Sequence, residues 1–95
     1  DDESNLVVHR AERNFVLLNL FPYNSGHLMV APFRHVGTLE ECDEETAREL
    51  FELTRRCEAI LRRDYRAQGV NIGMNIGAVA GAGVAGHIHM HAVPR

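Results

Sequence analysis

Three of the six histidines in this 95-residue chain fall within five positions, at His87, His89 and His91. Alternate side chains of an extended strand share one face, so these imidazoles should project together while Ile88 and Met90 face the opposite way. Imidazole can donate or accept a hydrogen bond, attack as a nucleophile or carry a proton near neutral pH. The spacing therefore predicts a chemical site on one face of a strand.

Two kinds of chemistry remain open for this row of histidines. Histidines two positions apart on a strand can bind one metal ion, but a strand advances about 3.3 Å per residue, so His87 and His91 would stand about 13 Å apart, too far to share an ion. That length matches several linked phosphates, and like-charge repulsion would keep one ring neutral while a neighbour holds a proton. The spacing favours nucleophilic and acid–base chemistry on phosphorus. Isolated histidines such as His9 and His35 are expected to be ordinary structural residues.

A glycine-rich segment, Gly81-Ala-Gly83-Val-Ala-Gly86, precedes the histidines and satisfies the pattern G-x-G-x-x-G. A dinucleotide-binding loop with this pattern opens a helix and is followed about 20 residues later by an acidic residue, whereas this segment precedes a strand and no acidic residue follows it here. Amides without side chains can approach an anion closely. We therefore predict that Gly81 and Gly83 bind phosphate, with a plain turn as the alternative.

Hydrophobic periodicity indicates the elements that must position these residues. The predicted strands cover residues 6–9, 14–20, 27–32, 70–76 and 87–93, and an amphipathic helix is predicted over residues 38–66. The helix has two candidate starts, a capping-box pair of Thr38 and Glu41 and a second N-cap at Asp43. This order indicates an antiparallel α+β domain.

Composition limits the class of protein. At 10.7 kDa, 45% hydrophobic and net charge −3, residues 1–95 form one domain near the lower size for independent folding, which favours a dimer. All ten basic residues are Arg, which excludes lysine-based phosphate loops and Schiff bases. We expect no nucleic-acid or membrane partner, a cytoplasmic location, reduced Cys42 and Cys57, and further N- and C-terminal segments outside this sequence.

The segment His87-Ile-His89-Met-His91-Ala-Val93 resembles the signature His-φ-His-φ-His-φ-φ, with φ apolar, of the histidine triad (HIT) superfamily of nucleotidyl hydrolases and transferases. Residues 19–32 resemble the family's first ribose and histidine segment, and residues 71–77 its penultimate strand. The glycine-rich phrases are most similar to bacterial members described as diadenosine tetraphosphate phosphorylases or hydrolases. The resemblance implies a HIT-like α+β fold, with about five antiparallel strands and one long helix across them, in a homodimer that joins two sheets.

The resemblance also implies roles for the histidines. His89, the middle member, is expected to attack the α-phosphorus and form a nucleotidyl-histidine. His91 is expected to contact the phosphate and assist the leaving group. His87 and His27 are expected to form a supporting imidazole pair that orients the nucleophile.

Substrate-binding residues follow from the same resemblance. Asn19 falls where the family contacts the ribose hydroxyls, and Asn75 where it places an amide near the phosphates. Leu17, Leu20 and Phe21 are candidates for the floor of the base pocket, with ordinary core packing as the alternative for each.

One departure concerns the loop before the histidines, where many family members carry Gln and Ser or Thr but this chain has Ala82 and Gly83. The leaving phosphate is then expected to be held by backbone amides or by another residue. The resemblance implies cleavage of dinucleoside polyphosphates by hydrolysis or phosphorolysis, without a metal or other cofactor. The alternatives are a phosphoramidate hydrolase of the same family, a metal-dependent hydrolase and a noncatalytic nucleotide-binding module.

Overall fold

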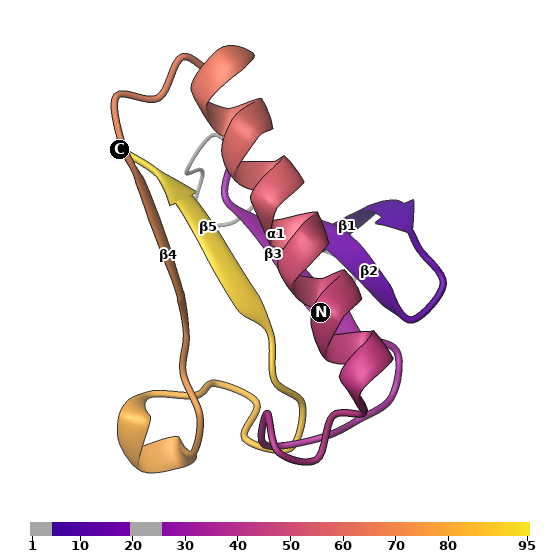
Figure 1. The fold of residues 1–95 in the computed structure, drawn as a ribbon. Helices are drawn as coiled ribbons and strands as arrows, with labels where there is room; N and C mark the ends of the chain where they lie inside the picture. Colours follow the sequence, from indigo (N-terminus) through magenta and orange to yellow (C-terminus); the bar gives the residue numbers. More distant parts are fainter. Residues whose placement is uncertain (1–4, 20–25) are drawn as a thin grey trace.

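An antiparallel sheet of five strands, crossed on one face by a long helix, is the architecture of residues 5–19 and 26–95, the part of the chain that the computed structural model describes (Figure 1). The elements in chain order are β1 (Asn5–Arg10), β2 (Asn14–Asn19), β3 (Leu28–Pro32), α1 (Glu44–Arg63), β4 (Val70–Met74) and β5 (Met90–Pro94). In space the strands follow the order β1-β2-β3-β5-β4. The predicted α+β class and antiparallel sheet are confirmed.

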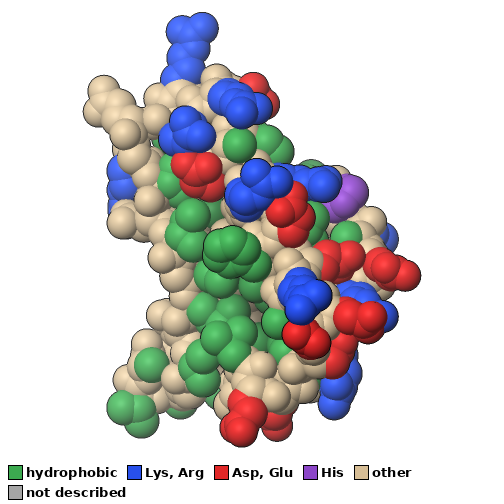
Figure 2. Space-filling model, in the orientation of Figure 1, with side chains coloured by type: hydrophobic (Ala, Val, Ile, Leu, Met, Phe, Trp, Pro, Cys, Tyr) green, Lys and Arg blue, Asp and Glu red, His purple; other side chains and the backbone are tan. Residues whose placement is uncertain are grey.

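One face of the sheet packs on the helix and supplies the core. Four core residues of α1, namely Leu50, Leu53, Cys57 and Leu61, recur every three or four positions, which places them on one side of the helix. The strands contribute Val16, Leu28, Val30 and Ala92 to the same cluster. The charged side chains of α1 lie on its outer surface, where acidic and basic groups alternate (Figure 2).

Strand register decides which residues share the opposite face. Leu17 of β2 pairs with Met29 of β3, and Met29 pairs with His91 of β5. Their neighbours Val16 and Val30 point to the core. Alternation therefore leaves the side chains at 17, 29 and 91 side by side on the face away from α1.

The helix starts and ends inside its predicted limits. Asp43 is the N-cap, and its carboxylate accepts a hydrogen bond from the Thr46 amide at 3.2 Å. The predicted start at Thr38 is wrong, because the reciprocal bonds between Thr38 and Glu41 close a separate turn before α1. The helix ends at Arg63, since Arg66 adopts a left-handed φ of 55° that no helix continues.

The last strand is shorter than predicted. Pairing of β5 with β3 runs only from Ala92 to Met90, and pairing with β4 also stops at Met90. His87 and His89 therefore precede the strand rather than lie in it, although Ile88 between them is buried and the alternation persists.

The two edges of the sheet differ. In the outer strand β1 the register with β2 shifts between Val7 and His9, which is a bulge or similar irregularity. The other edge strand, β4, pairs with β5 in unbroken register from Val70 to Met74. Within the described ranges, no helix is long and apolar enough to cross a membrane.

Candidate active site

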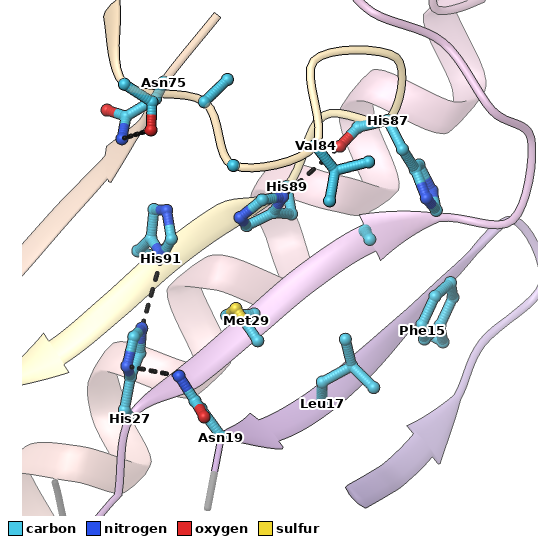
Figure 3. A pocket seen from close by; sticks show the side chains of 14 residues that line it. Phe15, Leu17, Asn19, His27, Met29, Asn75, Val84, His87, His89 and His91 are labelled. Atoms are coloured by element: carbon cyan, nitrogen blue, oxygen red, sulfur yellow. Dashed lines mark hydrogen bonds between the residues drawn. The ribbon is translucent and has the colours of Figure 1, made fainter. Parts of the chain in front are cut away.

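A cavity of about 530 Å³ lies on the face of the sheet away from α1 and collects nearly every residue that the sequence singles out (Figure 3). It is lined by Phe15, Leu17, Asn19, His27, Met29, Ala31, Asn75, Gly81, Ala82, Gly83, Val84, His87, His89 and His91. Leu20 and Phe21, two of the candidates for the base pocket, lie outside the described residues. The three histidines of the row do share one cavity, as their spacing predicts.

The His89 imidazole is oriented by a backbone carbonyl. Its Nδ1 lies 3.4 Å from the carbonyl oxygen of His87, an acceptor only, so we assign the Nδ1 proton to this contact. In the neutral ring the lone pair then resides on Nε2. Nucleophilic attack requires an available lone pair that a substrate can reach, and His89 lines the cavity.

His27 forms its imidazole pair with His91 and not with His87. His27 Nε2 lies 3.3 Å from His91 Nδ1, and the two ring centroids are 5.5 Å apart. The expected pair of His87 and His27 is therefore wrong as a contact. Because Met29 stands opposite His91, residue 27 reaches residue 91 diagonally, whereas His87 lies beyond the end of the ladder.

The Asn19 side chain fixes the protons of this pair. Its Nδ2 lies 3.3 Å from His27 Nδ1, so the amide donates and the ring nitrogen accepts. The proton of neutral His27 then resides on Nε2 and is donated to His91 Nδ1. Neutral His91 consequently carries its own proton on Nε2, where it can donate a hydrogen bond to a bound phosphate.

Burial keeps both members of the pair uncharged near neutral pH. Desolvation lowers the pKa of His27, and the nearby His89 imidazole lowers it further. The pKa of His91 is lowered by the same two causes and also by His27. Both rings are therefore in the neutral form, to which the tautomers assigned above apply.

His87 is held at the edge of the cavity by contacts of a different kind. Its Nε2 donates to the Pro32 carbonyl at 2.7 Å. The ring of His35 stacks on the ring of His87, with centroids 4.2 Å apart and planes inclined by 15°. The centroid of the Phe15 ring lies 6.4 Å from that of His87. These contacts fix the position of the His87 ring, and the His87 backbone carbonyl faces His89.

The glycine-rich loop forms one wall of the cavity and contains a short 3-10 turn, Ala78–Ala80. Gly81 has a φ of +93°, and its amide donates to the Ala78 carbonyl at 3.0 Å, so that amide is not available to a phosphate. Among the described residues, no acceptor engages the Gly83 amide. The predicted phosphate nest is therefore corrected at Gly81, and Gly83 remains a candidate.

The HIT domain family model matches residues 2–95, which is nearly the whole chain. The chain belongs to the HIT family. No group of three or more His, Cys, Asp or Glu side chains within residues 5–19 and 26–95 of this HIT domain is arranged to hold a metal ion.

Curated relatives of the HIT domain carry the names of nucleotide-cleaving enzymes. The protein named AP-4-A phosphorylase of Mycobacterium tuberculosis is 43% identical over 94 residues, 99% of this chain and 48% of that protein. The asymmetrical bis(5′-nucleosyl)-tetraphosphatase of Schizosaccharomyces pombe is 32% identical over 94% of this chain and 48% of its own length. This chain thus spans about half the length of both relatives.

Solved structures of HIT proteins share the fold. A HIT family member from Bacillus subtilis superposes with a TM-score of 0.84 at 28% identity, covering 96% of this chain and 64% of that one. A zinc-bound histidine triad family protein from Mycobacterium smegmatis gives a TM-score of 0.80 at 30% identity, covering 94% and 64%. The five-stranded sheet with its crossing helix is therefore the HIT fold.

Some residues in or beside the cavity of the HIT domain were not predicted to belong to the site. Met29 and Ala31 share the open face of β3, and period-two alternation from His27 was the signal that could have found them. His35 was expected to be an ordinary histidine, but it stacks on His87. Its position three residues after β3 carries no sequence signal of that contact.

Proposed function

We propose that this HIT domain cleaves a nucleoside 5′-phosphate from dinucleoside polyphosphates of the diadenosine tetraphosphate type, in two displacements through His89. The observation that carries the proposal is the Nδ1 contact of His89 with the His87 carbonyl, which leaves the Nε2 lone pair for attack. The names of the two curated relatives support the same substrate class. No cofactor is needed in this proposal, because side chains supply both the nucleophile and a hydrogen bond to the leaving group.

In the first displacement His89 Nε2 forms a bond to the α-phosphorus while the bond from phosphorus to the bridging oxygen breaks. The electron pair of that bond goes to the leaving phosphate oxygen, which accepts a hydrogen bond from the Nε2–H of neutral His91. The positive charge on the nucleotidylated His89 ring strengthens its Nδ1 hydrogen bond to the carbonyl. In the second displacement an oxygen of water or inorganic phosphate bonds to the phosphorus while the bond from phosphorus to His89 Nε2 breaks. The electron pair of that bond returns to Nε2, and the proton of an attacking water passes to the solvent.

The substrate would lie across the sheet face with its nucleoside over β2 and β3. Leu17 and Met29 offer an apolar floor for the base, and Asn19 contacts the ribose in this proposal. The phosphates would then reach His89 and His91, with Asn75 and the Gly83 amide on the far wall. Leu20, which was also predicted to bind substrate, lies outside the described residues.

The direct test is mass spectrometry of the protein quenched during turnover of diadenosine tetraphosphate. A nucleotidyl adduct on wild type, absent from His89→Asn and present on the matched control His9→Asn, is the expected result, with turnover of His89→Asn reduced by several orders of magnitude. Repeating the reaction with added phosphate distinguishes phosphorolysis, which yields ADP, from hydrolysis, which yields AMP. An adduct on His89→Asn, or none on wild type despite turnover, would refute the mechanism.

A metal-dependent hydrolase is the alternative that a comparison favours, since one structural neighbour is described as a zinc-bound protein. Activity measured after dialysis against EDTA separates the two. Full activity without metal supports the histidine nucleophile, and activity restored only by added zinc supports the alternative.

We also propose that the protein is a homodimer formed on the side of β4 and α1. Phe51 of α1 and Ile72 of β4 are 65% and 46% exposed, and hydrophobic side chains gather between the charged groups on this face (Figure 2). Light scattering of Phe51→Glu should give the mass of a monomer where wild type gives the mass of a dimer. A monomeric wild type would reject the proposal.

Cytoplasmic location and the lack of nucleic-acid and membrane partners stay predictions.

A further inference from the structure

The segment that carries His87 and His89 is not held by strand pairing. Pairing of β5 with both neighbours stops at Met90, so these histidines depend on other contacts for their position. Residues 32–36, the end of β3 and the loop after it, supply three. His87 Nε2 donates to the Pro32 carbonyl at 2.7 Å, the Ile88 amide donates to the Val36 carbonyl at 2.8 Å, and the His35 ring stacks on His87.

Only the last of these three contacts is made by a side chain of the loop. A centroid distance of 4.2 Å with nearly parallel planes is typical of a stacked aromatic pair. His35 itself is exposed, but its ring covers the ring of His87. The backbone carbonyl of His87 in turn accepts the hydrogen bond from His89 Nδ1. A displacement of His87 would therefore lengthen a contact that is already 3.4 Å and release the Nδ1 tautomer.

We infer that His35 is a positioning residue, whose ring holds His87 so that the His87 carbonyl keeps the His89 imidazole aimed into the cavity. The kinetic consequence rests on the proposed function, but the orientation of His89 does not. The stack needs a flat ring and not a titrating one. A phenyl ring at position 35 should therefore replace the imidazole, and a methyl group should not.

The test compares His35→Ala, His35→Phe and the control His9→Ala, which removes an exposed histidine of β1 outside the cavity. Formation of the nucleotidyl-enzyme should slow about tenfold in His35→Ala, equivalent to about 1.4 kcal/mol, and stay within about twofold of wild type in the other two. AMP affinity by calorimetry should be unchanged in all three, because the ring acts on the nucleophile and not on binding. Equal losses in His35→Ala and His35→Phe would overturn the inference, as would a wild-type rate in His35→Ala.

Proton-detected ¹⁵N spectra of the histidine rings provide a readout that does not require turnover. The His89 signal should show the Nδ1-protonated tautomer in wild type and His35→Phe, and a mixture of tautomers in His35→Ala. If wild type forms no adduct but the tautomer responds in this way, the proposed function fails and the positioning role stands. An unchanged tautomer in folded His35→Ala overturns the role itself, and if that variant does not fold, a mixed tautomer in His35→Phe does so.

Discussion

At the scale of single residues, the chemistry depends on which nitrogen of each imidazole holds a proton. Asn19 donates a hydrogen bond to His27 and His27 donates one to His91, while the His87 carbonyl accepts a hydrogen bond from His89 Nδ1. The neighbouring rings of His89 and His91 therefore have opposite roles. His89 offers a lone pair at its Nε2, and His91 offers a hydrogen-bond donor at its own Nε2. Neither assignment requires a charged group.

Replacing His91 with Asn should test its hydrogen bond to the leaving group. Asn places a weaker hydrogen-bond donor at a different position, so cleavage that expels a basic amine from a nucleoside phosphoramidate, where more charge develops on the leaving atom, should slow by about 10² to 10³. Cleavage that expels a nucleotide, a weaker base, should slow much less. The ratio of kcat/KM values for the two substrates measures this, and equal slowing would show that His91 acts by binding alone.

Acidification should destabilise the folded protein through His27 and His91. Their lowered pKa values mean that the unfolded chain binds protons below about pH 6.5 before the folded state does. Their contribution is complete above that pH and is lost as the pH falls through the folded values. Urea unfolding should give a smaller free energy at about pH 5.5 than at about pH 7.5, with a weaker dependence in His27→Gln. The pKa of Glu52, held at about 2 by Arg55 and Arg56, lies below this window.

At the scale of elements, α1 depends on its N-cap residue more than its many charges suggest. Asp43 accepts from the Thr46 amide at 3.2 Å and from the Thr46 hydroxyl at 2.6 Å. Removing it in Asp43→Ala should lower the free energy of unfolding by about 1 kcal/mol, whereas Asp43→Asn keeps a cap and should lose less. Chemical denaturation checks both, and equal losses would point to the charge and not to the cap.

The close approach of two loops near the cavity depends on Gly37. A methyl group there would lie 3.0 Å from the Ala85 carbonyl oxygen, a contact that requires the backbone to move. Because residues 85–86 lead directly into His87, Gly37→Ala should slow nucleotidyl transfer about three- to tenfold. Gly69→Ala, where a methyl group meets nothing within 4 Å, is the matched control for measured rates. Equal rates in both variants would show that the approach has no bearing on the site.

At the scale of the whole molecule, stability and chemistry reside on opposite faces of one sheet. Leu61 is fully buried against the core face, whereas the cavity lies on the other face. Leu61→Ala should therefore reduce the free energy of unfolding by about 2–5 kcal/mol. Nucleotide affinity, measured by calorimetry at a temperature where the variant is folded, should change little, and a parallel loss would show that the two faces are coupled.

The sheet, the helix and most cavity residues were predictable because they depend on periodicity within short segments. Period-two alternation placed His87, His89 and His91 on one face even though two of them precede the strand. The pairing of His27 with His91, which lie 64 residues apart in the chain, was not predictable, because it depends on the register between β3 and β5. The stacking of His35 on His87 could not be predicted either, because it depends on the position of the loop after β3, which no sequence pattern indicates.

The unequal edges of the sheet bear on assembly. The irregular register in β1 disfavours addition of another strand there, whereas β4 presents a regular row of hydrogen-bonding groups. Two copies joined through β4 would both end in a β1 edge, so their association is complete at two. The geometry that supports a pair therefore also opposes a fibre.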